Sequence, residues 1–238
     1  MKHVRLYQNA PLKINDTLQL DDYGSHYLAK VLRFPEGKDI TLFNGDGNNY
    51  TATVLSAKKH CEVQIHSTVA NQSESRLTLT LVQGIAKGDK MDFLMQKAVE
   101  LGVNQIVPIF TQHCVVRLKG DKLKKRQQHW QKIIIGACEQ SGRSVVPELL
   151  EPLDFNQFIE QDFGNKFVLH HRAEQSLLGV DPLTQATIII GPEGGLSDDE
   201  IQLAIKHNAQ PLLLGSRVLR TETASLAALA NMQLLWGS

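Results

Sequence analysis

The spacing of apolar residues changes character near residue 70. Before that point, short alternating runs are separated by turn residues, and the two runs in "KDITLFNGDGNNYTATVLSA" flank Gly45-Asp46-Gly47. This pattern predicts a β-hairpin, and "CEVQIHSTV" predicts one more strand. The stretch "SHYLAKVLRF" has apolar residues at a helical spacing instead, namely Tyr27, Leu28, Val31 and Leu32. Together these elements predict a small β-barrel-like domain over residues 1–70.

From Arg76 onward, short apolar runs alternate with amphipathic segments. The runs "LTLTLVQGIA", "QIVPIF", "KFVLHH", "ATIIIG" and "PLLLG" are typical of parallel strands that are buried on both faces. The amphipathic segments predict helices over about 89–101, 121–141, 197–207 and 221–236. The polar stretch 69–76 lacks periodicity and separates the two patterns. We therefore predict that residues 71–238 form an α/β domain with a mainly parallel sheet.

Composition is that of an ordinary globular protein. Of 238 residues, 42% are hydrophobic and 21% are charged. No apolar run approaches the roughly 20 residues that span a bilayer, and "MKHVRLYQNAPL" lacks the apolar stretch of a signal peptide. The three cysteines are widely spaced and form no C-x-x-C pair, which suits a reducing compartment. We expect a cytoplasmic protein that has no membrane segment and no metal site.

The formal net charge is zero, but the positive charges are not spread evenly. The run "RLKGDKLKKRQQHWQK" (117–132) contains seven Lys/Arg against one Asp. A solvated helix face explains such a run about as well as a polyanionic partner does. Both interpretations stay open at this point.

Three loops of the second domain are candidate ligand-binding loops. Ligands of parallel α/β sheets bind beyond the carboxyl ends of the strands, so we consider the loops after Leu169, Ile190 and Leu214. The second loop, "GPEGGLSDDE", has the glycines of a phosphate-binding loop but lacks its Lys and its spacing. A tight turn alone would also explain the glycines.

Acidic residues in the glycine loop favour a ligand other than phosphate. Glu193, Asp198 and Asp199 would oppose a phosphate by roughly 4 kcal/mol for each charge at about 4 Å. A neutral or cationic ligand fits better. Ser197 and Glu200 predict a capping box at the start of the following helix.

The remaining polar stretches have two interpretations each. Arg217 and Arg220 form either surface salt bridges or a site for an RNA phosphate or base, and Thr221 predicts the N-cap of the last helix. His170 and His171, taken as strand neighbours, would point to opposite faces and make a poor zinc site. The pair His113-Cys114 is interpreted as strand content. The stretches "GACEQSGR" and "KGDKMD" are either functional or form caps and turns.

Four of these stretches resemble one known family. "GPEGGLSDDE", "LGSRVLRTETA", "GACEQSGR" and "KGDKMDFLMQKAVELGV" are similar to the signature stretches of the RsmE family, bacterial methyltransferases that methylate N3 of a uridine in small-subunit (16S) ribosomal RNA. The N-terminal "HYLAKVLRFPEGKDITLFNGDGNNYTATV" resembles the PUA-like RNA-binding domain of that family. The resemblance covers nearly the whole chain, in the same order.

The resemblance implies a fold, an assembly and a cofactor. It implies a SPOUT domain with a deep trefoil knot, a homodimer, and S-adenosylmethionine held in the loops 169–173, 191–196 and 214–220. The residues that it implies for the cofactor are Leu169, His170, His171, Gly191, Pro192, Glu193, Gly194, Leu214, Gly215, Val218, Leu219, Arg220 and Thr223.

For catalysis, we expect attack of uridine N3 on the sulfonium methyl group, without metal or covalent nucleophile. Glu193 is our candidate for attracting the sulfonium, and Arg220 for stabilising the uracil oxygens as N3 loses its proton. The residues expected to bind RNA are Arg5, Lys30, Arg33, Lys122, Lys124, Lys125, Arg126, Arg143 and Arg217. A phosphate-binding nucleotide enzyme, another SPOUT methyltransferase and a non-catalytic RNA-binding protein remain the alternatives.

Overall fold

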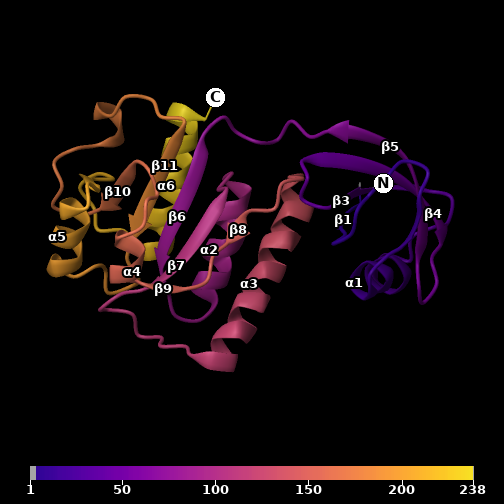
Figure 1. The fold of residues 1–238 in the computed structure, drawn as a ribbon, viewed down its shortest axis with the longest axis horizontal. Helices are drawn as coiled ribbons and strands as arrows, with labels where there is room; N and C mark the ends of the chain where they lie inside the picture. The colour runs from indigo at the N-terminus through magenta and orange to yellow at the C-terminus, as the bar shows by residue number, and fades with distance from the viewer. Residues whose placement is uncertain (1–3, 238) are drawn as a thin grey trace. The chain divides into compact units, whose positions relative to one another are not determined.

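The computed structural model describes residues 4–237, which divide into two compact units (Figure 1). The first unit contains residues 4–74 and 138–146, and the second contains 75–137 and 147–237. The sequence-based boundary lay at residue 70. That boundary does not include residues 138–146, which belong to the first unit. Residues 1–3 and 238 of the two predicted domains lie outside the described part of the chain.

The first unit is built on a five-stranded sheet with the order β1-β3-β4-β5-β2. The parallel pair is β1–β3, and the other neighbours are antiparallel. The hairpin predicted around Gly45-Asp46-Gly47 is confirmed as the connection between β3 and β4. Register shifts in the β4–β5 pair add local twist. The strands are β1 (Arg5–Tyr7), β2 (Thr17–Gln19), β3 (Asp39–Phe43), β4 (Asn48–Ser56) and β5 (Glu62–Ala70).

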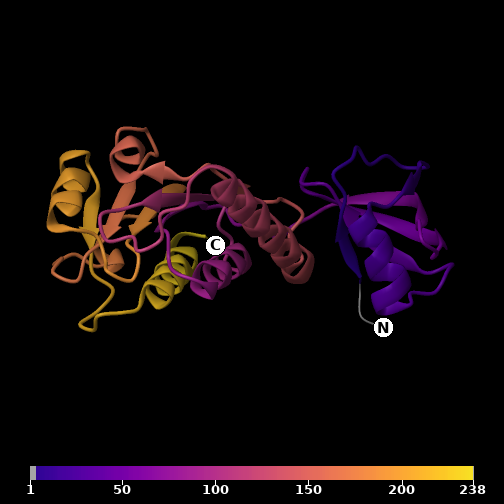
Figure 2. The same ribbon diagram turned by 90° about the horizontal axis from the view of Figure 1, so that it is seen from below.

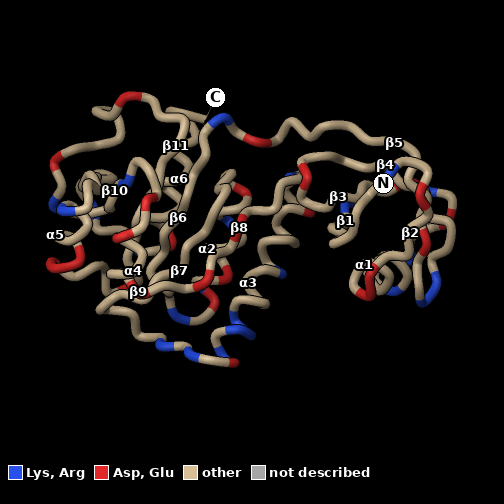
Figure 3. Tube along the Cα trace, viewed as in Figure 1, with Lys and Arg blue, Asp and Glu red and all other residues tan. Residues whose placement is uncertain are grey.

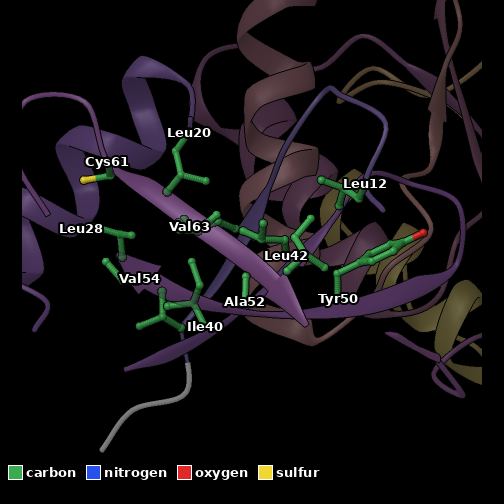
Figure 4. Close-up of a cluster of buried hydrophobic side chains, with 13 residues drawn as sticks. Leu12, Leu20, Leu28, Ile40, Leu42, Tyr50, Ala52, Val54, Cys61 and Val63 are labelled. Atoms are coloured by element: carbon green, nitrogen blue, oxygen red, sulfur yellow. The ribbon is translucent and has the colours of Figure 1, made fainter. Parts of the chain in front are cut away.

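Alternate residues of these strands form the core of the first unit (Figure 4). Ile40, Ala52 and Val54 are fully buried, as the alternation predicts. Leu28 completes this core from a helical segment that comprises α1 (Asp22–His26) and a π-helical turn, η1 (Tyr27–Leu32).

The π-helical turn departs from the predicted amphipathic helix. Of the four apolar residues in the predicted pattern, Leu28 is buried, whereas Val31 is 59% exposed and Leu32 is 37% exposed. A π turn has a wider hydrogen-bonding span than an α-helical turn, so an α-helical period does not predict which residues face the core.

Residues 138–146 belong to the first unit because their polar groups bond within it. Arg143 is 3% exposed, and its guanidinium donates to the Glu74 carboxylate with N···O distances of 2.9 and 2.5 Å. Arg5 donates to Asn49, to the Ser144 hydroxyl and to the Arg143 carbonyl. Both guanidinium groups thus have partners inside this unit, and the RNA-binding role expected for Arg5 and Arg143 stays a prediction.

The second unit is built on a parallel sheet with the order β12-β10-β11-β6-β7-β8, in which β9 also pairs with β7. The predicted parallel sheet is confirmed. The strands are β6 (Thr78–Gly84), β7 (Gln105–Phe110), β8 (Glu148–Leu149), β9 (Leu153–Asp154), β10 (Lys166–Leu169), β11 (Gln185–Ile190) and β12 (Gln210–Leu212).

Helices cover both faces of the parallel sheet (Figure 2). The pair α2 and α6 lies on one face, where Trp236 packs against Phe167 of β10 with ring centroids 5.8 Å apart. The pair α4 and α5 lies on the other, where Phe158 joins the cluster of Val82 and Ile189. The helices are α2 (Asp89–Glu100), α3 (Gly120–Ser141), α4 (Phe155–Ile159), η2 (Leu177–Gly179), α5 (Asp198–Lys206) and α6 (Thr221–Trp236). Within the described residues, no helix is long and apolar enough to span a membrane.

Replacing Arg143 by alanine should destabilise the first unit, because Glu74 would lose its buried partner. Removing one member of a buried ion pair costs about 3–5 kcal/mol. Glu74 is 25% exposed, so we expect a loss of about 2–3 kcal/mol in the free energy of unfolding. Urea unfolding followed by hydrogen exchange in peptides of the first unit measures this change.

The matched control is Lys59→Ala, at an exposed position of the same unit. It should change the free energy of unfolding by less than about 0.5 kcal/mol. Equal stabilities of the Arg143 and Lys59 variants would contradict the role of the ion pair.

Candidate functional site

A cavity of about 320 Å³ lies at the carboxyl ends of three adjacent strands of the second unit. Leu169 of β10, Ile190 of β11 and Leu212 of β12 line it. Parallel pairing in register brings these three strand ends to one edge of the sheet. The volume falls in the range that small-molecule ligands occupy.

The three loops selected from the sequence surround this cavity. Most residues expected to hold the cofactor line it: Leu169, His170, His171, Gly191, Pro192, Glu193, Gly194, Leu214, Gly215, Val218 and Leu219. Arg220 and Thr223 are exposed residues outside its lining. The lining also includes Arg217, which we had predicted to bind RNA, and Thr221, which we had predicted to be a helix cap.

A buried hydrogen-bond network fixes the floor of the cavity. The Thr221 hydroxyl donates to the Gly191 carbonyl at 2.6 Å and accepts from the Gln83 side-chain amide at 2.9 Å. The Ser225 hydroxyl donates to the other end of the Gln83 amide at 2.6 Å. The predicted N-cap is therefore wrong: Arg220 occupies the cap position, and the Thr221 hydroxyl is used by the loop after β11.

Sequence reasoning missed Gln83 and Ser225. Gln83 is fully buried at the end of β6, and Ser225 is fully buried in the second turn of α6. Gln83 could have been identified from the sequence, because it is a polar residue within the apolar run "LTLTLVQGIA" and buried polar groups need hydrogen-bond partners.

Two positions, Gly191 in the glycine loop and Gly84 at the end of β6, have no room for a side chain. A Cβ on Gly191 would lie 2.6 Å from the backbone of Gly195 and Leu196, and one on Gly84 would lie 2.5 Å from Pro192. Contacts this short are backbone clashes, so these glycines allow the end of β6 and the loop to pack closely.

The Glu193 carboxylate is held by the segment that follows β6. It accepts a hydrogen bond from the Lys87 backbone N–H at 3.0 Å, and the Lys90 ammonium lies 3.3 Å away. Partial burial acts to raise the pKa of Glu193, but hydrogen bonds from backbone N–H groups and from Lys90 outweigh it and lower the pKa. Glu193 is therefore ionised at neutral pH, with a cation beside it.

The far end of the glycine loop is tied to the residues after β7. The predicted capping box is confirmed, with Glu200 accepting from the Ser197 N–H at 2.8 Å and the Glu200 N–H donating to the Ser197 hydroxyl. Glu200 also accepts from the Gln112 N–H at 2.8 Å. The His113 ring nitrogen Nδ1 lies 3.0 Å from the Gly194 carbonyl, so His113 is a turn residue beside the loop and not strand content as predicted.

The two histidines of the cavity lie in the turn after β10. They follow the end of β10 at Leu169, so the strand geometry assumed from the sequence does not apply, and their rings meet edge to face at 5.2 Å. Burial lowers the pKa of His170, and His171 and Arg172 lower it further. His170 is thus neutral at neutral pH, and its buried Nε2 lacks a hydrogen-bond partner among the described residues. Among the described residues, no group of three or more His, Cys, Asp or Glu could hold a metal ion.

Basic residues gather at the start of α3 (Figure 3). Lys122, Lys124 and Lys125 are exposed there. Arg126 lies 3.6 Å from Asp92 of α2 and is therefore partly neutralised. In the first unit, Lys30 and Arg33 are exposed, as their predicted role requires.

Two family models match the chain. An RNA methyltransferase domain matches residues 73–233, and an RNA methyltransferase PUA domain matches residues 20–65. The first match covers more than half of the chain and includes all three loops of the cavity.

Individual relatives agree with the family models. The Buchnera aphidicola (subsp. Acyrthosiphon pisum) protein named ribosomal RNA small subunit methyltransferase E is 33% identical over 98% of this chain and 94% of its own length. A solved structure from Legionella pneumophila, a putative methyltransferase in complex with the bound cofactor SAM, is 39% identical with a TM-score of 0.96 over 100% of both chains. A Neisseria gonorrhoeae ribosomal RNA small subunit methyltransferase E bound to S-adenosyl methionine is 38% identical with a TM-score of 0.92 over 99% of this chain and 98% of its own. This chain therefore belongs to the RNA methyltransferase family that includes the ribosomal RNA small subunit methyltransferases E.

Proposed function

We propose that this protein transfers a methyl group from S-adenosylmethionine to N3 of a uridine in the RNA of the small ribosomal subunit. The observation that carries the proposal is the cavity at the ends of β10, β11 and β12, which the three family loops line. Relatives with bound S-adenosylmethionine at 38–39% identity over nearly the whole chain support the choice of cofactor. The same relatives favour S-adenosylmethionine over a phosphate ligand, and so disfavour the alternative of a phosphate-binding nucleotide enzyme.

The residues of the cavity fit this cofactor. Leu212, Leu214 and Leu219 offer apolar surface, and the buried Nε2 of His170 offers a hydrogen-bonding atom that still lacks a partner among the described residues. Neutral His170 adds no positive charge beside a cation, whereas Asp198 adds a negative one at the rim. S-Adenosylmethionine, when bound there, supplies a methyl group on a positively charged sulfur.

The protein must then present an unpaired uracil that has lost its N3 proton. N3–H lies on the Watson–Crick edge, so the base has to be outside a duplex. Holding both reactants in line contributes up to about 7–11 kcal/mol in the most favourable intramolecular cases. We propose that the exposed Arg220, next to the lining residues Leu219 and Thr221, stabilises the uracil oxygens as charge develops.

We propose a role for Glu193 that differs from the one expected from the sequence. Its carboxylate already interacts with Lys87 and Lys90, which hold one side of the glycine loop. We propose that Glu193 shapes the loop through these contacts, and that its net electrostatic effect on a sulfonium is reduced by the Lys90 charge.

The charge distribution supports RNA as the substrate. Lys122, Lys124 and Lys125 are exposed at the start of α3, as contacts to phosphates require. We propose that they bind the RNA backbone, together with Arg217 at the rim of the cavity.

The knot implied by the family remains part of the proposal. After β12 at the edge of the sheet, residues 213–220 lead to α6 on the face that it shares with α2. The bond from Thr221 to Gly191 brings this crossing segment against the loop after β11. We propose that the crossing segment is threaded through that loop.

The surface of α6 supports a homodimer. This helix has apolar residues on more than one side: Leu229 and Met232 are fully buried, while Leu234 is 76% exposed and Leu235 is 36% exposed. A helix that has apolar residues outside its buried face is often covered there by another element. We propose a second copy of the chain as the cover, in keeping with the family.

The first test concerns the cofactor loop. Gly191→Ala should weaken S-adenosylmethionine binding at least tenfold, because the new Cβ would force the loop backbone away from its position. Calorimetry measures the affinity. Gly179→Ala is the matched control, since its Cβ would meet only a side-chain atom at 4.0 Å, and it should bind normally. Equal affinities for the two variants would contradict the assigned site.

The second test concerns the reaction. With labelled S-adenosylmethionine and small-subunit RNA or 30S particles, we expect a single 3-methyluridine, located by nucleotide mapping. Arg220→Ala should lower the single-turnover rate by about 10²–10³-fold, which is the effect of losing one donor to a developing oxyanion. Methylation at another atom would contradict the proposed function, and a normal rate in the variant would remove Arg220 from catalysis.

The third test concerns the dimer. Leu234→Glu should shift the protein toward monomer in sedimentation analysis, because a charge would be buried in the interface. Leu178→Glu changes a residue that is 83% exposed on η2 and should leave the association state unaltered. A wild-type monomer at micromolar concentration would contradict the proposed assembly.

A further inference from the structure

An exposed tyrosine is stacked on a half-buried one in the helical segment of the first unit. The rings of Tyr23 and Tyr27 are stacked, with an interplanar angle of 6° and centroids 6.0 Å apart. Tyr27 packs against the core of the unit, whereas Tyr23 is 58% exposed. The outer ring thus rests on a fixed inner ring and still presents most of its surface to solvent.

The surroundings of Tyr23 keep its phenol protonated. The Glu139 carboxylate acts on the phenol from nearby, and it accepts a hydrogen bond from the Tyr7 backbone N–H at 3.0 Å. Burial raises the pKa of Tyr23, and the charge of Glu139 raises it further, so the phenol keeps its proton. A ring held at one face by a packed neighbour is pre-organised to receive a planar ligand, because less side-chain entropy is lost on binding.

The surroundings of this pair suit one end of an RNA segment. Lys30 and Arg33 are exposed in the same helical segment and at its end, and Val31 adds apolar surface at 59% exposure. Asp21, which caps α1 by accepting from the Gly24 N–H at 2.7 Å, and Glu139 place negative charge beside Tyr23, so phosphates would bind on the Lys30 side of the pair. Aromatic surface next to Lys and Arg is the arrangement that binds unpaired nucleotides, with bases on the rings and phosphates on the cations.

We propose that the stacked pair Tyr23–Tyr27 is a platform for an unpaired nucleobase of single-stranded RNA. This inference rests on the proposed function, in which RNA is the substrate. It adds a site for a base to the first unit, whose Lys and Arg residues by themselves would bind only the phosphate backbone. Stacking on an aromatic ring tolerates different bases, so the platform holds a strand without selecting its sequence.

The test measures binding of the full-length protein to a fluorescent single-stranded RNA of about 12 nucleotides, and to a duplex of the same length. Tyr23→Ala should weaken single-strand binding about tenfold, by the same factor at each salt concentration. Duplex binding should change little, since paired bases offer no free face. Lys30→Ala should instead reduce the salt dependence of binding.

Matched variants separate stacking from folding. Tyr23→Phe and Tyr23→Trp keep a ring and should bind the single strand within about twofold of the wild type. Val69→Ala removes a residue of the same unit that is 62% exposed and should have no effect. The melting temperature of each variant confirms that the unit is folded.

Four results would overturn the platform. They are normal single-strand binding by Tyr23→Ala, an equal loss for single strand and duplex, a change in association state that makes the pair a protein contact, and a normal KM for RNA in Tyr23→Ala. Methyl transfer by the wild-type protein is measured in parallel. If the wild-type protein transfers no methyl group, the proposed function is refuted and the platform is not.

Discussion

The hydrogen bond from the Thr221 hydroxyl to the Gly191 carbonyl is the interaction on which the candidate site depends. Parallel pairing brings three strand ends to one edge of the sheet but leaves the loops beyond them free. The bond joins the loop after β11 to the first residue of α6, and Gln83 and Ser225 complete its surroundings. Because all four groups are buried, a displaced loop would leave polar atoms without partners at about 1–3 kcal/mol each.

The electrostatics of the cavity follow from how its ionisable residues are paired. Glu193 is ionised but stands beside Lys90, and His170 is neutral because burial lowers its pKa. Asp198 is an exposed carboxylate at the rim with Arg172 4.0 Å away, and Arg217 adds a cation to the lining. The acidic and basic groups of the cavity thus offset one another, so its charges do not oppose a sulfonium cofactor.

Local patterns predicted the elements, and long-range contacts accounted for the errors. The periodicity of "DKMDFLMQKAVE" predicted α2, whose residues Met91 and Leu94 are buried, because a helix must turn its apolar face to the core. An isolated Arg is normally exposed, so the sequence contains no sign that Arg5 and Arg143 are bonded within the first unit. Their partners Asn49 and Glu74 lie 44 and 69 residues away along the chain. The exposure of Val31 followed from a π turn, which has no reliable apolar signature.

The sequence by itself determined the class of the fold, the family, and the three loops that hold the site, since these depend on periodicity and on the order of local motifs. Only the tertiary structure decided which side chains fix the positions of these loops. Gln83, Thr221 and His113 act on the glycine loop from other segments, and Tyr23 gains its role from the ring of Tyr27. Such roles are set by distances between remote segments. A side chain's partners are fixed when packing brings those segments together, and spacing along the chain contains no measure of that distance.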